Sequence, residues 1–154
     1  MYRTKNGDLQ VLLAHPGGPY FKKKNDGYWS IPKGEIEPEE DYLVAAKREF
    51  TEEIGMSPSG PYIALVPVTQ KGGKIVHAWA CRDDCDAAFI RSNTFTLEWL
   101  PGSGQQEEFP EVDRAEFFGI EEAKRKIKQA QVALIDELVA KLKEVSLEEE
   151  YVTA

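Results

Sequence analysis

The sequence has few residues of the kinds that build zinc centres or disulfide frameworks. Among its 154 residues are only two cysteines and two histidines. Cys81 and Cys85 are spaced as a metal-binding or disulfide pair can be, but no second pair of cysteines or histidines accompanies them. The sequence therefore excludes a four-ligand zinc centre, and we expect both cysteines to be ordinary reduced thiols.

Long apolar runs are also lacking. No segment approaches the roughly 18 consecutive apolar residues of a membrane-spanning helix. Residues 1–6 lead into no uninterrupted apolar stretch of the kind that a secretory signal contains. We therefore expect a cytoplasmic protein that has no membrane partner.

Positive charge is scarce relative to negative charge. The chain has 19 lysines and arginines against 27 aspartates and glutamates, which gives a net charge of −8. This balance argues against nonspecific binding to nucleic acid through a basic face, and we expect no nucleic-acid partner.

Internal repeats, low-complexity segments and a second domain are absent as well. The apolar content of 42% and the charged content of 30% are ordinary for a soluble globular protein. We expect residues 1–147 to form a single domain and residues 148–154 to form a frayed acidic tail. The sequence leaves the oligomeric state open.

The most informative feature present is a group of three glutamates. Glu49, Glu52 and Glu53 fall at positions i, i+3 and i+4, which places their carboxylates on one face of a helix. Like charges at these spacings weaken a helix by about a few tenths of a kcal/mol per pair. A divalent cation such as Mg²⁺, which prefers oxygen ligands, would compensate this repulsion. Taken alone, the three glutamates also fit an ordinary solvent-exposed helix.

The surrounding residues favour a helix with one packed side. An apolar stripe lies beside the carboxylates, and Gly55 stands where a left-handed C-terminal cap is wanted. Arg48 is four residues before Glu52, close enough to pair with it. The stripe consists of Leu43, Ala46, Phe50 and Ile54, and the N-terminus of the helix is predicted near Pro38, Glu39, Glu40 and Asp41.

From Gly34 to Met56 the chain reads G-x5-E-x7-R-E-U-x-E-E-x-G-U, where U is an apolar residue. This pattern is identified as the Nudix box, and the chain resembles the Nudix hydrolase superfamily, although Phe50 is bulkier than the aliphatic residue usual there. The flanking segments 15–19, 29–35 and 109–114 are similar to a bacterial group of predicted NTP pyrophosphohydrolases, which in turn resembles the diadenosine tetraphosphate hydrolases.

The expected elements alternate between strands and helices, which predicts an α/β protein with a mixed sheet. The resemblance implies the same class, an α/β/α sandwich of the Nudix type. Only residues 1–3 remain of the first strand usual in related chains, so either that strand is short or the chain begins late. We expect strands at 9–15, 28–32, 62–70, 74–82, 94–100 and 114–119, a hairpin turn at 71–73, loops at 15–27, 57–61 and 101–106, and helix over 121–145 with a break near 128–130.

The resemblance implies that water attacks a phosphorus atom of a nucleoside diphosphate linked to another group, X, with Mg²⁺ or Mn²⁺ as cofactor. It makes Glu52 and Glu53 metal ligands and Glu49 either a ligand or the general base. Gly34 is implied to offer its carbonyl to the metal. Arg48 would orient the glutamates, and Glu40 would hold the loop.

Outside the box, Glu111 is the best candidate for an extra ligand or the base, with Glu108 and an ordinary exposed acid as the alternatives. Lys33 is a candidate phosphate contact. The run Lys22, Lys23 and Lys24 could grip distal phosphates or could be a solvated charge run. Tyr28, with Tyr20, Phe21 and Trp29, offers faces for base stacking or for core packing. His15 and His77 are expected to be structural.

The sequence thus predicts a metal-dependent pyrophosphohydrolase acting on a small nucleotide, with dinucleoside polyphosphates such as diadenosine tetraphosphate as the preferred substrate class. An ADP-ribose or (d)NTP pyrophosphatase is the alternative. A non-catalytic nucleotide-binding module is disfavoured because all the box glutamates are present. Hydrolysis of an RNA 5′-triphosphate end is disfavoured because such a protein needs a basic track for the following nucleotides.

Overall fold

A central antiparallel sheet has the strand order β1-β2-β9, built from β1 (Tyr2–Lys5), β2 (Asp8–Pro16) and β9 (Val112–Gly119). The computed structural model describes the backbone of residues 1–153 and the side chains of residues 1–146. Strand β2 is apolar along consecutive residues because both of its faces are covered. Val11 and Leu13 pack into one core with Phe118, and Leu12 packs into the other core with Phe50.

One parallel bridge ties a further segment to this sheet, and a second parallel bridge joins two segments outside it. Tyr2 pairs with Arg82 and Trp29 pairs with Ile127, both in parallel orientation. The predicted mixed α/β architecture is therefore confirmed. The strand expected at 28–32 is wrong, because only Trp29 and Ser30 make isolated bridges there, Ser30 pairing with Ala14.

Helix α1 (Tyr42–Ile54) begins and ends through local capping. The Asp41 side chain accepts from the backbone N–H groups of Leu43 and Val44, and Gly55 adopts a left-handed conformation with φ of 88°. The predicted C-terminal cap is confirmed. The predicted N-terminus is confirmed as well, because Asp41, the last of the four residues expected there, is the cap.

The expected hairpin around residues 71–73 forms, but both of its strands are interrupted. Strand β3 (Tyr62–Ala64) pairs with β6 (Trp79–Cys81), and β4 (Val68–Thr69) pairs with β5 (Ile75–Val76). Between β3 and β4, Pro67 has no N–H to give to a ladder. The Val66 N–H instead donates to the carboxylate of Glu137 at 2.8 Å. Two short pairs therefore replace the long ones predicted.

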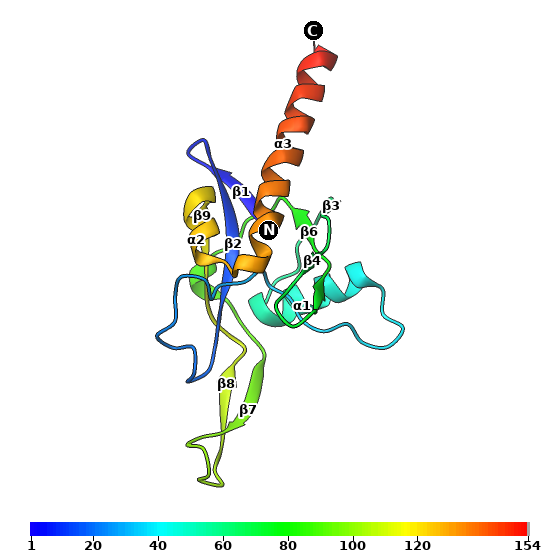
Figure 1. Ribbon diagram of the computed structural model, residues 1–154. Coiled ribbons are helices and arrows are strands. Elements are labelled where there is room, and N and C mark those ends of the chain that lie inside the picture. The colour runs from blue at the N-terminus through cyan, green and yellow to red at the C-terminus, as the bar shows by residue number, and fades with distance from the viewer. Residues whose placement is uncertain (154) are drawn as a thin grey trace.

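A second hairpin consists of β7 (Thr94–Glu98) and β8 (Gln106–Pro110), with Thr94 opposite Pro110 and Phe95 opposite Phe109. In Figure 1 it projects from the body on the side opposite to the far end of α3. Strand β8 was not predicted, because its sequence of Gln, Glu, Glu, Phe and Pro shows no apolar alternation. A short 3₁₀ helix, η1 (Ala87–Phe89), precedes this hairpin.

The C-terminal region is helical with a break, as expected. Helix α2 (Ile120–Lys126) is followed by the 3₁₀ turn η2 (Gln129–Gln131) and by α3 (Val132–Thr153). The backbone of residues 148–153, predicted as a frayed tail, is part of α3, and Ala154 lies outside the described residues. Within the described part of the chain, no helix combines the length and apolar character needed to cross a bilayer.

Candidate active site

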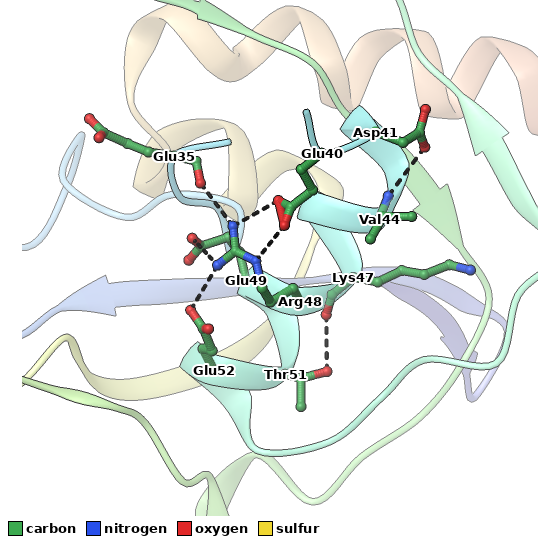
Figure 2. Close-up of polar contacts among 9 residues, drawn as sticks. All are labelled: Glu35, Glu40, Asp41, Val44, Lys47, Arg48, Glu49, Thr51 and Glu52. Carbon is green, nitrogen blue, oxygen red and sulfur yellow. Dashed lines mark hydrogen bonds and ion pairs between the residues drawn. The ribbon is translucent and has the colours of Figure 1, made fainter. Parts of the chain in front are cut away.

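Arg48 is the centre of the polar network on α1 (Figure 2). Its guanidinium donates to both carboxylate oxygens of Glu40 at 2.9 Å, to Glu49 at 2.8 Å and to Glu52 at 3.2 Å. It also donates to the backbone carbonyl of Glu35 at 2.9 Å. The predicted pairing of Arg48 with Glu52 is confirmed. One side chain thus holds two carboxylates of the helix and the loop that precedes it.

Gly34 lies directly against the carboxyl group of Glu49. A Cβ atom on residue 34 would overlap all three atoms of that carboxyl group. The backbone conformation does not itself require glycine here, because no left-handed φ occurs at this position. Glycine is therefore needed for the close approach of the chain to Glu49.

Glu53 is the helix glutamate whose pKa burial shifts most clearly. Its Oε2 accepts a hydrogen bond from the backbone N–H of Lys33 at 3.1 Å. Burial raises the pKa of Glu53 to about 8, and the neighbouring carboxylate of Glu49 adds to the rise. The ionised form of Glu53 is therefore disfavoured at this position, although the backbone N–H and the ammonium group of Lys33 act in the opposite direction.

Glu111 joins the helix glutamates from a different part of the chain. It lies in the turn between β8 and β9. Burial raises its pKa, and the carboxylates of Glu49 and Glu52 raise it further. The competing acid, Glu108, is exposed on β8 and contacts the hydroxyl of Thr94. Of the two candidates, Glu111 is the one that the fold brings to the cluster.

A short connecting segment, residues 91–93, links the end of α1 to Glu111. The N–H groups of Arg91 and Asn93 donate to the carbonyls of Ile54 and Glu52 at 3.0 and 2.7 Å, and the carbonyl of Asn93 accepts from Glu111 N–H at 2.8 Å. Sequence reasoning missed this connection, because backbone contacts between residues far apart in the chain leave no periodic signal. It fixes the separation between the helix and Glu111.

The donor set fits a hard divalent cation. Four carboxylates gather from two elements, and the pKa values of two of them, Glu53 and Glu111, are raised by burial and by their neighbours. Within the described residues, no three His, Cys, Asp or Glu side chains already surround a single point as ligands. Oxygens of Glu49 and Glu52 bond to the guanidinium of Arg48 in this arrangement. Carboxylate oxygens are the ligands that Mg²⁺ or Mn²⁺ prefers.

Lysines cluster beside the carboxylates. Burial lowers the pKa of Lys33, and the nearby ammonium groups of Lys128 and Lys74 lower it further. Neither Lys74 nor Lys128 was predicted, because the fold brings them to Lys33 from a distant hairpin and from the segment after α2. Lys22 and Lys24 are exposed, and within the described part of the chain their side chains make no hydrogen bond or ion pair with the four carboxylates.

A cavity of 520 Å³ opens beside this cluster. Lys33, Gly34, Glu49 and Lys74 are among its polar lining, and apolar residues of β2, α1, α3 and the β3–β6 pair line much of the remainder. Tyr42 and His77 also line it, with their rings stacked 4.1 Å apart. The cavity thus joins a polar edge to an apolar interior, which suits a ligand with a charged part and an aromatic part.

His15 is structural, as the sequence predicts. Its ring is fully buried, its Nε2 donates to the carbonyl of Lys24 at 2.6 Å, and its Nδ1 lies 2.7 Å from a carboxylate oxygen of Asp113. These contacts fasten the loop of residues 17–28, which we call the aromatic loop, to the sheet. Gly17 N–H in turn donates to the carbonyl of Glu111 at 2.9 Å.

Comparison with known proteins agrees with this geometry. The family model for the NUDIX domain matches residues 1–138. A Caenorhabditis elegans Ap4A hydrolase in a binary complex has a similar fold, with a TM-score of 0.64 and 20% identity over 93% of this chain and 94% of that one. The NUDIX domain of Shewanella oneidensis NrtR, complexed with ADP ribose, gives a TM-score of 0.61 and 14% identity over 92% and 82% of the two chains.

The Escherichia coli ORF135 protein is also similar, with a TM-score of 0.51 and 22% identity over 90% of this chain and 84% of that one. At these identities the solved structures show the fold alone. No curated protein sequence matches. Because the family model covers most of the chain and the box pattern is complete between Gly34 and Met56, the chain belongs to the NUDIX family.

Proposed function

We propose that the protein is a pyrophosphohydrolase, dependent on Mg²⁺ or Mn²⁺, that cleaves a nucleoside diphosphate linked to a group X. The observation that carries this proposal is the convergence of Glu49, Glu52 and Glu53 of α1 with Glu111 of the β8–β9 turn. A bound divalent cation would shield the phosphates and lower the pKa of water. Glu52, Glu53 and Glu49 would hold the cation together with the carbonyl of Gly34.

The remaining residues position the substrate and the attacking water. Lys33 and Lys74, which line the cavity, are placed to neutralise the phosphates near the carboxylates. Glu111 is the better candidate for the general base, because Arg48 already binds Glu49 at 2.8 Å. Burial and the carboxylates of Glu49 and Glu52 raise the pKa of Glu111, which favours a role in taking up a proton. Arg48 is a positioning residue that orients Glu49 and Glu52.

Dinucleoside polyphosphates such as diadenosine tetraphosphate are the substrate class that we favour, with asymmetric cleavage to a monophosphate and a triphosphate. The 520 Å³ cavity beside Lys33 supports this choice, because an aromatic base can enter its apolar part while the phosphates stay at the carboxylates. The shared fold with the Ap4A hydrolase gives further support.

An ADP-ribose or (d)NTP pyrophosphatase is the second candidate. The similar NUDIX domain complexed with ADP ribose favours it, since the same fold accommodates that ligand. Both substrates need the same carboxylates, so the distinction concerns how the group X is bound. A binding module without turnover is the third candidate, and the complete set of box glutamates speaks against it.

The test is a comparison of kcat/KM for diadenosine tetraphosphate, ATP, dGTP and ADP-ribose, with products identified after reaction in ¹⁸O-labelled water. We expect a preference for the dinucleotide and ¹⁸O in the monophosphate product. A preference of about tenfold or more for a mononucleotide or ADP-ribose corresponds to roughly 1.4 kcal/mol of transition-state stabilisation. It would show that the proposed substrate class is wrong, but the proposal of a pyrophosphohydrolase would stand. No turnover of any of the four would favour the binding module.

A further inference from the structure

The tip of the β7–β8 hairpin carries an aromatic pair that the proposed chemistry does not use. Trp99, just after β7, packs edge-to-face against Tyr20 of the aromatic loop, with 5.5 Å between ring centroids. Trp99 is half-buried, whereas 57% of Tyr20 is exposed. The pair thus presents aromatic surface to solvent at a site that two separate segments build.

The hairpin and the aromatic loop are packed together along their length. Gly18, with a φ of 92°, faces the ring of Phe95, whose tip would lie 2.9 Å from a Cβ atom on residue 18. Gly17 approaches the carbonyl of Pro110 so closely that a Cβ atom there would overlap it. The fixed position of Tyr20 beside Trp99 follows from these contacts, because a bulkier residue at 17 or 18 would push the segments apart.

The aromatic loop combines stacking faces with positive charge. Phe21 and Tyr28 are 39% and 38% exposed, and the ammonium group of Lys24 lies 5.5 Å from the centre of the Tyr28 ring. Lys22 and Lys23 lie in the same loop. Aromatic rings beside lysines bind bases by stacking and phosphates by charge, whatever the base is.

The cavity and the hairpin that carries the aromatic pair adjoin different residues of the carboxylate cluster. Glu49 lines the cavity, whereas Glu111 lies at the root of the β7–β8 hairpin, next to the Thr94–Pro110 pair. From Thr94 to Trp99 the hairpin extends roughly 16 Å at the usual rise of an antiparallel strand. A ligand that spans both sites therefore needs a long charged bridge between two aromatic ends.

We propose that Tyr20 and Trp99 form the binding site for the second base of a dinucleoside polyphosphate whose first base enters the cavity. This inference rests on the proposed function for the placement of the phosphates, but it concerns binding and does not require turnover. The lysines of the aromatic loop contact the phosphates between the carboxylates and the second base. A mononucleotide fills the cavity and the carboxylate cluster and leaves the aromatic pair unused.

The experiment measures dissociation constants by calorimetry with Mg²⁺ present, in a Glu111→Gln background, so that turnover does not disturb the measurement and the helix glutamates that would hold the cation are kept. Trp99→Ala and Tyr20→Ala are compared with the conservative variants Trp99→Phe and Tyr20→Phe. Phe89→Ala is the matched control, because Phe89 is 80% exposed and belongs to η1. The ligands are diadenosine tetraphosphate, ATP and a short RNA with a 5′-triphosphate.

We expect each alanine variant to weaken diadenosine tetraphosphate binding about tenfold, as loss of one base–aromatic stack does, while ATP binding changes less than twofold. The phenylalanine variants should retain most of the affinity, and Phe89→Ala should match the parent. Equal losses for ATP and the dinucleotide, or no loss for either, would overturn the inference. A loss confined to the RNA would assign the aromatic pair to a different ligand and would also overturn it.

If the hydrolysis assays fail while the binding pattern holds, the proposed function is wrong but the second base site stands. If hydrolysis of the dinucleotide is observed without the binding pattern, the second base site is wrong but the function stands. Thermal unfolding of each variant separates loss of binding from loss of fold.

Discussion

Residue 34 and Glu49 share a space that admits only one side chain: the Glu49 carboxyl group occupies the position that a methyl group on Gly34 would take. Gly34→Ala should therefore displace Glu49 and break its bond with Arg48. We expect kcat to fall at least tenfold, Mg²⁺ affinity to weaken and Tm to drop by a few degrees, because only 12% of the Glu49 side chain is exposed and displacing it breaks its bond with Arg48. Steady-state kinetics over a range of Mg²⁺ concentrations will measure both effects.

The matched control is Gly119→Ala. Gly119 also has an ordinary φ, of −60°, but a Cβ atom there has nothing within 4 Å. Its activity should stay within about twofold of wild type. If Gly34→Ala behaved in the same way, the close approach to Glu49 would have no role in catalysis.

Arg48→Gln should destabilise the protein mainly when no metal is bound. The guanidinium bridges Glu40, Glu49 and Glu52, and without it these carboxylates are left without a cation. Because charge-assisted hydrogen bonds contribute about 1.5–3 kcal/mol each and do not add, we expect a Tm lower by several degrees in EDTA. Mg²⁺ should restore part of the loss by supplying positive charge. An equal loss with and without Mg²⁺ would contradict the shared role of the arginine and the metal.

Glu52→Gln, Glu53→Gln and Glu111→Gln should each lower kcat about 10²- to 10⁴-fold without unfolding the protein, the range typical for loss of a general base. The double variant Glu52→Gln/Glu53→Gln should lower kcat by far less than the product of the two single reductions, because both residues act on one site. Glu111→Gln should leave Mg²⁺ affinity closer to wild type than the helix variants if it is the base. Glu108→Gln, on the neighbouring exposed strand, is the control and should be near wild type.

The pH dependence of stability in the absence of metal should depend on Glu53. Burial raises the pKa of this carboxyl group to about 8 in the folded protein, above its ordinary value of 4.5. A raised folded pKa means that its contribution to stability is fully present below pH 4.5 and is lost as the pH rises through 8. In EDTA, the Tm of Glu53→Gln should therefore exceed that of wild type increasingly from about pH 5 to pH 8 and by a constant amount above that. Saturating Mg²⁺ should reduce this difference, because a bound cation favours the ionised carboxylate.

Local signals explain what could be predicted from the sequence. Helix α1 was predicted because Phe50, Ile54 and the glutamates repeat at helical spacing and Gly55 caps the end within the same segment. The elements that could not be predicted depend on contacts between distant segments. The pairing of β8, whose residues are mostly polar, comes from β7 across the hairpin, and the gathering of Lys74 and Lys128 around Lys33 comes from the tertiary fold.

For Glu111, the sequence indicated the residue but not its position relative to the other glutamates. Its candidacy came from the family resemblance of segment 109–114, which gave a residue but no geometry. Its distance from the helix depends on residues 91–93, whose N–H groups bind the carbonyls at the end of α1. A composition of Arg, Ser and Asn predicts only a loop, so the connection between Glu52 and Glu111 required the fold.

Activity should require Mg²⁺ or Mn²⁺ absolutely and should rise on the alkaline side of neutrality. Among the described residues, Arg48 is the one cation whose side chain bonds the helix carboxylates, and it also bonds Glu40. Phosphates that bind beside these carboxylates therefore need further positive charge. Exhaustive EDTA treatment should abolish hydrolysis of the preferred nucleotide, and added Mg²⁺ or Mn²⁺ should restore it. The rate should increase above pH 7, because the attacking water must lose a proton and a higher pH favours that loss. Full activity in EDTA would show that the carboxylates act without a metal, and the four-carboxylate cluster would then need another explanation.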